Sequence, residues 1–303
     1  MKKILLIIIL TMVNMACDST KSSNQEEEKA AKKLKVFAVN YPLFYFAERI
    51  GGPHVELIYP IPNDVDPAYW VPREDLDKIQ NADLILTNGA NYAKWMEKVS
   101  LPASKVINTS EAFAEQYIKL AEGTTHSHGG AGEHVHYGFA FTTWLDFKIA
   151  TGQAKAVLNA LILKMPHAKE TFIGNFEKLK SELLALDAKM TALSTKLPKK
   201  AIFASHPVYQ YLGEAYGLTI ISEHWEPGEE PTTVQWSEFK HNLDHNPANI
   251  MLWEGTPTDE TRSKLQSFGV NSILFSPSAN TPATGDFMSI MNQNITSLNS
   301  YLE

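Results

Sequence analysis

Histidine is spread unevenly along this chain of 303 residues, and its grouping is the first feature that could do chemistry. Four of the ten histidines lie within eleven residues, at His126, His128, His134 and His136. Neutral imidazole is the commonest metal ligand, and two His-x-His pairs can offer several nitrogens to one ion. Zinc suits these donors, and copper or nickel would also fit. Since the segment is rich in Gly, we expect a flexible His-rich loop over 124–137, with loose metal scavenging as the alternative reading.

A further candidate ligand, His206, comes directly after the short apolar run Ala201 to Ser205. A polar residue at the carboxyl end of a parallel strand stands where such sheets bind ligands. The alternative for His206 is a helix cap or an interface histidine. Three weaker candidate ligands lie near similar strand ends: His224, Glu226 and Glu254. We treat four other histidines as surface residues: His54, His167, His241 and His245.

Common catalytic motifs are missing from the chain. It has no G-x-S-x-G elbow, no G-x-x-x-x-G-K-[ST] phosphate loop and no H-E-x-x-H pair. Glu254 or Asp146 could serve in acid–base catalysis, but neither has a visible partner. We therefore expect a binding protein and no enzyme.

The N-terminus predicts export. Lys2 and Lys3 precede the aliphatic run Ile4 to Leu10, and small residues lead to the single cysteine, Cys17. This pattern is typical of a secretory signal over 1–17, and Asn14-Met15-Ala16-Cys17 resembles a bacterial lipobox. Lipidation of Cys17 would anchor the chain to a bacterial membrane, facing the periplasm or the exterior. Residues 18–33 are polar and charged, which favours a flexible tether.

Composition narrows the function classes further. The chain carries a formal charge of −7, and 44 % of its residues are apolar. A net acidic chain has no basic face with which to displace counterions from phosphates, so we expect no nucleic-acid partner. With no second cysteine, no intrachain disulfide can support the fold.

Short apolar runs alternate with helical segments in both halves of the chain, which predicts parallel βα units. We expect an N-terminal α/β lobe over 34–150, a connecting helical segment over 151–198 and a C-terminal α/β lobe over 199–303. The connecting segment carries an apolar stripe at helical spacing: Phe176, Leu179, Leu183, Leu186, Met190, Leu193 and Leu197. We favour one long helix packed on both lobes, although a coiled-coil dimer would give the same stripe; we expect a monomer.

Seven segments, taken in order, resemble the solute-binding lipoproteins of bacterial zinc and manganese ABC importers. They are Tyr41-Pro42-Leu43 with Ala47-Glu48-Arg49-Ile50-Gly51-Gly52; Asp66-Pro67; Ala82-Asp83-Leu84 with Asn88-Gly89; Trp144-Leu145-Asp146; Ser205-His206 with Tyr211-Leu212; Tyr216-Gly217-Leu218; and Glu229-Glu230-Pro231-Thr232. The resemblance covers roughly residues 35–303. It implies two α/β lobes joined by one long helix, capture of a divalent ion, and delivery to an ABC importer permease. It implies zinc first, with manganese or another divalent ion as alternatives, because a His-rich loop before Trp-Leu-Asp is typical of zinc members.

The chain departs from this family at three usual ligand positions. Ala68 stands where a histidine commonly follows Asp-Pro, Thr142 stands where another precedes the Trp, and Pro277 stands near a usual aspartate. Only His206 matches. We expect a relocated site in which His134 and His136, six to eight residues before Thr142, join His206, with water, Glu226 or Glu254 as a fourth donor.

Two binding alternatives to a free ion stay open. The first is a metal chelate or small organic solute held by aromatic side chains, for which the candidates are Tyr69, Trp70, Trp225 and Trp236, with a place in the core as the alternative for the tryptophans. The second is an adhesin-type surface lipoprotein with no transport role.

Overall fold

The computed structural model describes residues 32–120, 124–127, 133–136 and 138–302, and of 124–127 and 133–136 only the backbone. The predicted signal peptide, Cys17, nearly all of the predicted tether and His128 lie outside the described residues. The account below concerns the body formed by Lys33–Glu303. Within its described part, no helix is both long enough and apolar enough to span a bilayer.

The N-terminal half is built on a parallel sheet in the order β2-β1-β3-β4. Its strands are β1 (Leu34–Ala38), β2 (Val55–Ile58), β3 (Leu84–Thr87) and β4 (Val106–Asn108). The helices after β1 and β2 are α1 (Tyr41–Gly51) and α2 (Leu76–Gln80). The Asn40 side chain accepts a hydrogen bond from the Leu43 amide at the start of α1, and Gly52 takes a positive φ at its end. Polar capping and a glycine stop thus bound α1 at its two ends.

The C-terminal half repeats this plan with a parallel sheet in the order β10-β9-β7-β8. Its strands are β7 (Ala201–Ala204), β8 (Ile220–Ser222), β9 (Ala248–Trp253) and β10 (Asn271–Leu274). The helices are α5 (Gln210–Tyr216), α6 (Thr233–His245), α7 (Asp259–Ser267) and α8 (Phe287–Ser300). A capping box between Thr232 and Gln235 starts α6.

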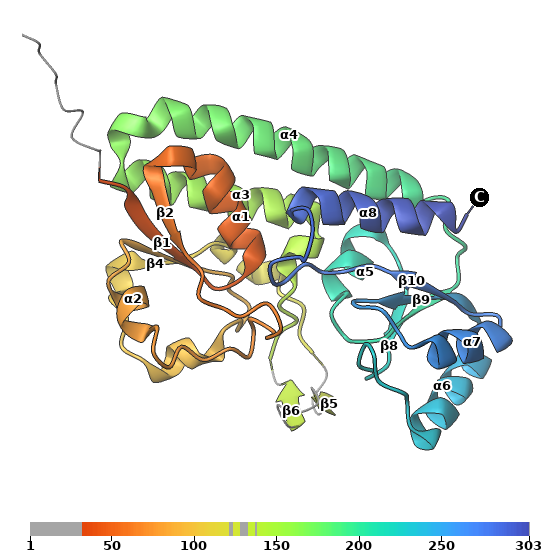
Figure 1. The fold of residues 1–303 in the computed structure, drawn as a ribbon. Coiled ribbons are helices and arrows are strands. Elements are labelled where there is room, and N and C mark those ends of the chain that lie inside the picture. The colour runs from red at the N-terminus through yellow and green to blue at the C-terminus, as the bar shows by residue number, and fades with distance from the viewer. Residues whose placement is uncertain (1–31, 121–123, 128–132, 137, 303) are drawn as a thin grey trace, which may run out of the picture. The chain divides into compact units, whose positions relative to one another are not determined.

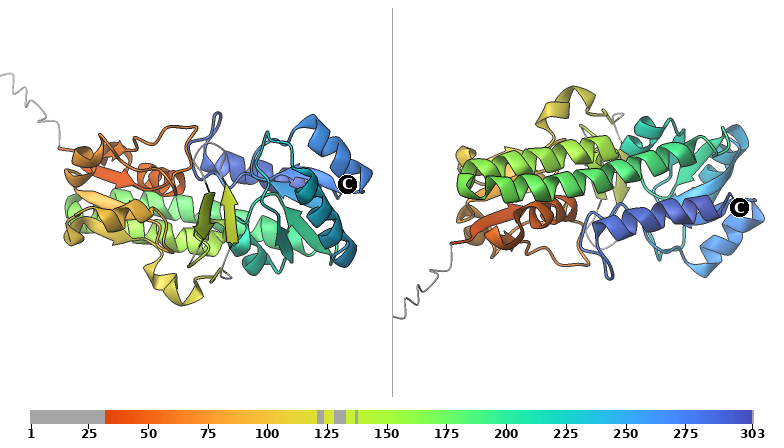
Figure 2. Two further views of the ribbon diagram at one scale, coloured as in Figure 1. Left: turned by 90° about the horizontal axis from the view of Figure 1, so that it is seen from below. Right: turned by 90° about the horizontal axis from the view of Figure 1, so that it is seen from above.

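The long helix α4 (Lys169–Ser194) runs along both halves, α3 (Phe147–Lys164) packs antiparallel to it beside the N-terminal half, and α8 packs on α4 (Figures 1 and 2). The predicted stripe of α4 is buried in the main core, so it is not available to a coiled-coil partner. The expected fold of two parallel α/β lobes with one long helix is therefore confirmed. The sequence did not single out α3, which packs against α4 along its length.

Two local predictions were wrong. The spacing of apolar residues from Ala90 to Val99 predicts an α-helix, but positive φ angles at Ala90, Asn91 and Ala93 delay any helix until the short 3₁₀ turn Lys94–Lys98. The expected flexible loop over 124–137 contains two antiparallel strands, β5 (Thr124–Ser127) and β6 (Glu133–His136), with His126 opposite His134. Backbone pairing across the segment thus replaces part of the expected loop.

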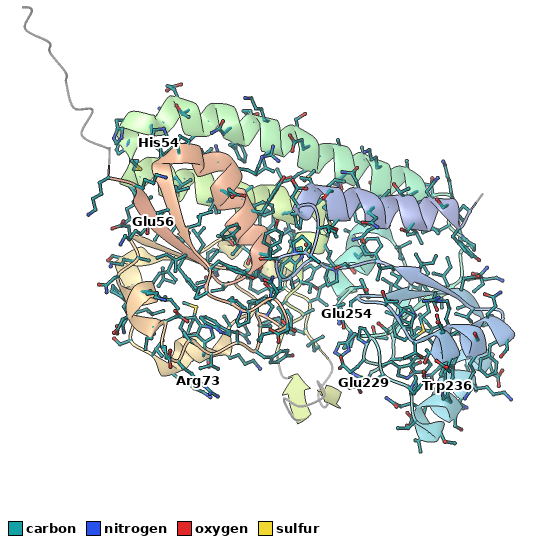
Figure 3. The ribbon with its side chains drawn as sticks, viewed as in Figure 1. His54, Glu56, Arg73, Glu229, Trp236 and Glu254 are labelled. Carbon is teal, nitrogen blue, oxygen red and sulfur yellow. The ribbon has the colours of Figure 1, made fainter. Side chains whose placement is uncertain are left out.

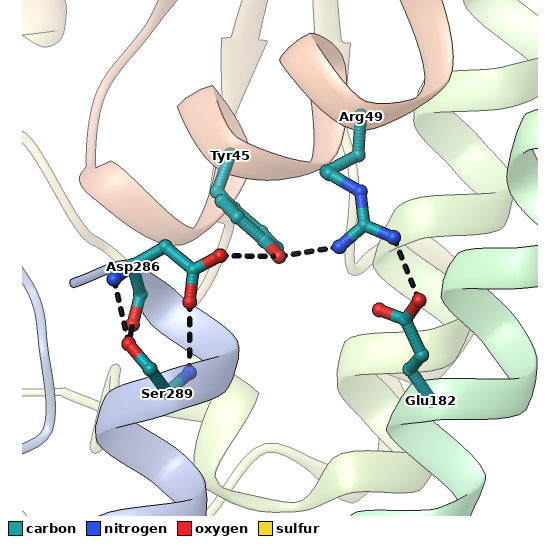
Figure 4. A network of polar contacts seen from close by, with 5 residues as sticks. All are labelled: Tyr45, Arg49, Glu182, Asp286 and Ser289. Carbon is teal, nitrogen blue, oxygen red and sulfur yellow. Dashed lines mark hydrogen bonds and ion pairs between the residues drawn. The ribbon is translucent and has the colours of Figure 1, made fainter.

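A polar network ties α1, α4 and α8 together (Figure 4). Arg49 on α1 donates to Glu182 on α4 at 2.9 Å and to the Tyr45 hydroxyl, which donates to Asp286 at 3.2 Å. Asp286 caps α8 by accepting from the Ser289 amide at 2.8 Å. Since α8 belongs to the C-terminal half and α1 to the N-terminal half, this network joins the two lobes.

The cap at Asp286 should make stability depend on pH. Burial raises the pKa of Asp286, but hydrogen bonds from Ser289 and Tyr45 and the charge of Arg49 outweigh it and lower that pKa below its ordinary value. A lowered carboxyl pKa stabilises the fold fully above the unfolded pKa of about 4, and this contribution disappears as the pH falls through the folded pKa. Urea unfolding should therefore show the largest gap between wild type and Asp286→Asn above about pH 5, shrinking towards about pH 3. A gap that stays constant over this range would contradict the assignment.

The stripe of α4 offers a test of packing with a built-in control. Leu183 is fully buried, whereas its neighbour Leu184 is 40 % exposed. We expect Leu183→Ala to lower the free energy of unfolding by about 2–5 kcal/mol, because it leaves a cavity between the helices. Leu184→Ala should change it by no more than about 0.5 kcal/mol. Denaturant titration of both variants checks this, and equal losses would show that α4 does not pack as described.

Candidate metal centre

Three neighbouring strands of the C-terminal sheet end at one edge, and each is followed by a candidate ligand. His206 comes after β7, Glu226 after β8 and Glu254 directly after β9. Because β7 lies between β8 and β9 in the sheet, the three segments leave it side by side. The carboxyl edge of a parallel sheet is where such folds bind ligands.

Backbone hydrogen bonds continue beyond the strands and hold these segments in place. The amides of Glu223 and Trp225 donate to the carbonyls of Ala204 and Ser205, both at 2.8 Å. The Ser205 amide donates to the Leu252 carbonyl at 2.8 Å on the other side. These bonds carry Glu226 alongside His206, and the Trp225 ring anchors the segment by packing on Trp236 with ring centroids 4.7 Å apart.

The three side chains converge. The Nδ1 atom of His206 lies 3.6 Å from an Oε1 atom of both Glu226 and Glu254. One ligand atom from each of the three residues lies within 4.8 Å of the others, and among the described side chains no other group of three such ligands is as close. His206 is buried, with 2 % of its surface exposed, while the two carboxylates are half-buried. One nitrogen and two carboxylate oxygens are a suitable partial donor set for a first-row divalent ion.

This cluster forms one wall of a cavity of about 530 Å³ between the two halves. Figure 3 shows Glu254 near the middle of the view, on the inner side of the C-terminal half. The N-terminal half contributes Asp64, Asp66 and Tyr69 to the opposite wall. The lining thus carries four carboxylates, from Asp64, Asp66, Glu226 and Glu254, with neither Lys nor Arg among its residues. Such a concentration of negative charge attracts cations.

Tyr69 lies within the electrostatic reach of carboxylates from both halves. Burial, followed by the charges of Asp66, Glu254 and Glu226, raises the pKa of the Tyr69 phenol far above its ordinary value. The phenol therefore keeps its proton at neutral pH and can act as a hydrogen-bond donor inside the cavity.

The loop that carries Asp66 is fastened to the other half of the molecule by Asn280. The Asn280 amide donates to the carbonyls of Pro62 and Val65 at 2.7 and 2.8 Å, and its oxygen accepts from the Tyr59 hydroxyl at 3.1 Å. The position of the N-terminal wall is thereby set by a residue of the C-terminal half.

His224 lies at the back of this site. Its ring centroid is 6.2 Å from that of His206, in an edge-on arrangement. Burial lowers the pKa of His224 despite the charges of Glu226 and Glu238, which favours the neutral imidazole. His224 lines a second cavity and not the first one.

The other predicted site residues fare differently. His126, His134 and His136 lie on β5 and β6, whose backbone alone is described, so their role stays a prediction. Of the four aromatic candidates, Tyr69 lines the cavity. Trp225 and Trp236 are buried in the core around Phe239, and Trp70 packs on Phe37 and Trp95, so the prediction that they line the cleft was wrong.

Sequence reasoning missed Asp64 and Asp66 as wall residues. Both follow β2 in a polar loop, so the strand-end rule used for His206 could have found them.

Each of the three departed family positions makes a structural contact. Ala68 is buried against the core, and its amide donates to the Asp66 carboxylate at 2.9 Å. The Thr142 hydroxyl donates to the Val208 carbonyl at 2.5 Å. The Pro277 carbonyl accepts from the Trp144 indole N–H at 2.8 Å. These positions support the walls, and the described cluster draws all its ligands from the C-terminal half.

Comparisons with known proteins agree with this architecture. A relative, the iron ABC transporter substrate-binding lipoprotein MtsA of Streptococcus pyogenes serotype M1, is 27 % identical over 280 residues, which is 87 % of this chain and 85 % of the relative. The manganese-binding lipoprotein MntA of Halalkalibacterium halodurans is 22 % identical over 232 residues, covering 75 % of this chain and 72 % of that protein.

Solved structures show the same fold. The metal-dependent lipoprotein YcdH of Bacillus subtilis superposes with a TM-score of 0.74 at 20 % identity, covering 88 % of this chain and 99 % of that one. The Zn(II)-bound ZnuA-like domain of AdcA from Streptococcus pneumoniae gives 0.73 at 20 % identity, covering 89 % and 98 %. The family model described as ZnuA, zinc-uptake complex component A, periplasmic, matches residues 36–301. The chain therefore belongs to this family, the metal-binding substrate-binding proteins of ABC transporters.

Proposed function

We propose that this chain captures a divalent metal ion outside the cytoplasm and delivers it to the permease of an ABC importer. The observation that carries the proposal is the convergence of His206, Glu226 and Glu254 within 4.8 Å on a cavity wall. Two carboxylates beside a buried imidazole repel each other until a cation lies between them. The four carboxylates of the cavity add to that attraction.

We propose zinc as the cargo. Zinc binds a given set of N and O donors more tightly than Mn²⁺ or Fe²⁺ in the Irving–Williams order, and it accepts carboxylate as well as imidazole ligands. The zinc-bound relatives support this choice by analogy of fold alone.

Manganese or ferrous iron is the second candidate, and one feature of the site favours it. Two of the three converging donors are carboxylates, and oxygen-rich sets with room for water suit Mn²⁺ and Fe²⁺. The cavity of about 530 Å³ leaves that room, since a water occupies only about 30 Å³. The relatives named for iron and manganese agree with this alternative.

The predicted relocation of histidines adds donors to this set. We propose that His134 and His136, on β6, supply further nitrogens to the ion held by His206. Two observations support the proposal: β6 is close in sequence to Thr142, and Ala68 and Thr142 lack the imidazoles that the family usually has at these positions. Attachment of Cys17 to a bacterial membrane by lipid would keep the chain near its permease.

Replacement of the buried imidazole should abolish tight binding. We expect His206→Asn to raise the dissociation constant for zinc by at least about 100-fold, because even outer-shell partners of metal ligands account for about 10–100-fold. His167→Asn, an identical change at an exposed histidine, should leave binding unchanged. Calorimetric titration of both metal-free proteins measures this, and equal affinities would reject the site.

The same titration can separate the contribution of His206, Glu226 and Glu254 from that of His134 and His136 on β6. Glu254→Gln keeps the shape of the side chain and removes one charge, so zinc affinity should fall as it does for His206→Asn. If His134 and His136 are also ligands, the double variant His134→Ala with His136→Ala, which keeps His206, Glu226 and Glu254, should bind zinc less tightly than the wild type. No change in that double variant would confine the site to the C-terminal half.

The identity of the cargo can be read from the protein itself. Protein purified without chelators should contain zinc near one equivalent per chain in the cleft, and His206→Asn should lose that equivalent. Because protons compete for the imidazole and carboxylates, bound metal should decrease as the buffer is acidified below about pH 6. Manganese or iron in place of zinc would favour the second candidate, and a metal-free cleft in all preparations would overturn the proposed function.

A further inference from the structure

A second group of metal-ligating side chains lies on the outer face of α6, apart from the cleft. Glu238, His241 and His245 follow one another at spacings of three and four residues, so they share one face of the helix. All three are exposed. The rings of His241 and His245 have centroids 4.4 Å apart, which is close enough for one ion to approach both.

The hydrogen bonding of His245 sets its ring for metal binding. Its Nδ1 atom lies 2.8 Å from the carbonyl oxygen of His241. A carbonyl can only accept, so Nδ1 carries the proton and the lone pair of the neutral ring is on Nε2. Metal-bound histidines commonly donate their second ring N–H to a backbone carbonyl in the same way.

The surroundings of His241 are acidic. Glu238 and His241 line a cavity of about 570 Å³ together with Glu223 and His224, and this lining contains neither Lys nor Arg. Glu223 is buried, with 6 % of its surface exposed, and accepts from the Asn242 amide at 3.1 Å. Its carboxylate and that of Glu238 place negative charge beside the imidazoles, which favours a cation.

We propose that His241 and His245 form a second site for a divalent transition-metal ion on the outer face of α6. Two imidazole nitrogens suit Zn²⁺, Cu²⁺ or Ni²⁺, with water completing the coordination. Binding there is weaker than in the cleft, because the site offers only two protein ligands and both are exposed side chains that the ion must order. This site is proposed for binding alone and does not depend on the proposed transport function.

The position of this site gives it a connection to the cleft. His224 lines the same cavity as His241, and its ring lies 6.2 Å from that of His206. The cavity beside His241 thus reaches the ring that packs against the cleft ligand His206.

The proposal is tested by counting zinc ions per full chain in equilibrium dialysis. We expect His241→Gln with His245→Gln to lose one weak equivalent and to keep the cleft equivalent. A matched control, Lys240→Gln with Asp244→Asn, changes an exposed pair of the same spacing on the same helix without altering the net charge, and should lose none. His206→Asn should lose the tight equivalent and keep the weak one, so failure of the cleft site and failure of this site are distinguishable.

A residue-resolved measurement distinguishes zinc bound by His241 and His245 from zinc bound by the histidines of β5 and β6, which all these variants keep. On addition of zinc beyond one equivalent, the imidazole NMR signals of His241 and His245 should shift together, while that of exposed His167 should not. Retention of every equivalent by the His241→Gln, His245→Gln variant, or unshifted signals from both rings, would overturn the proposal.

Discussion

The order of strands in the C-terminal sheet is the constraint on which the site depends. His206, Glu226 and Glu254 are far apart in sequence, and they meet because β7 lies between β8 and β9. The backbone bonds from Glu223 and Trp225 to the end of β7 extend that arrangement past the last regular residue. The result is an imidazole with two carboxylates at 3.6 Å, an arrangement that is electrostatically favourable only with a positive charge among them. Metal capture is the role that we propose for this cluster.

The opposite wall is held still by contacts that cross between the lobes. Asn280 fastens the loop that bears Asp66, and the Trp144 indole N–H bonds the Pro277 carbonyl. The network from Arg49 to Asp286 joins α1, α4 and α8 behind the cleft. These polar contacts join the two lobes, and the buried stripe of α4 packs on both. Any relative motion of the lobes that bound the cleft must therefore break hydrogen bonds. We therefore expect only small relative motion of the two lobes on ion capture.

Much of the fold was accessible from periodicity, whereas the site was accessible only in part. Runs such as Ala201 to Ser205 predict strands directly, and the 3–4 spacing of leucines predicts α4. α3 was harder to single out, because its buried stripe contains the small residues Ala150 and Ala154, while the large apolar Leu163 is exposed. His206 could be placed at a strand end, yet Glu226 and Glu254 ranked as weaker candidates, because the order of strands in a sheet cannot be read from local pattern. Trp225 and Trp236 were placed in the cleft for a related reason: composition identifies an aromatic residue but not which side of a segment faces the core.

The departed family positions have a consequence for how an ion is held. At Thr142 the hydroxyl is used by the Val208 carbonyl, at Pro277 the carbonyl is used by Trp144, and Ala68 packs against the core. None of the three side chains offers a metal ligand, so the described donors all come from one lobe. In the proposed site, an ion held by His206, Glu226 and Glu254 would keep coordination positions open towards Asp66 and Tyr69, for water or for the proposed His134 and His136. Fewer protein–metal bonds would then have to break for release, so the ion would be bound less tightly and would dissociate faster. Faster dissociation suits a carrier whose task is to pass the ion on.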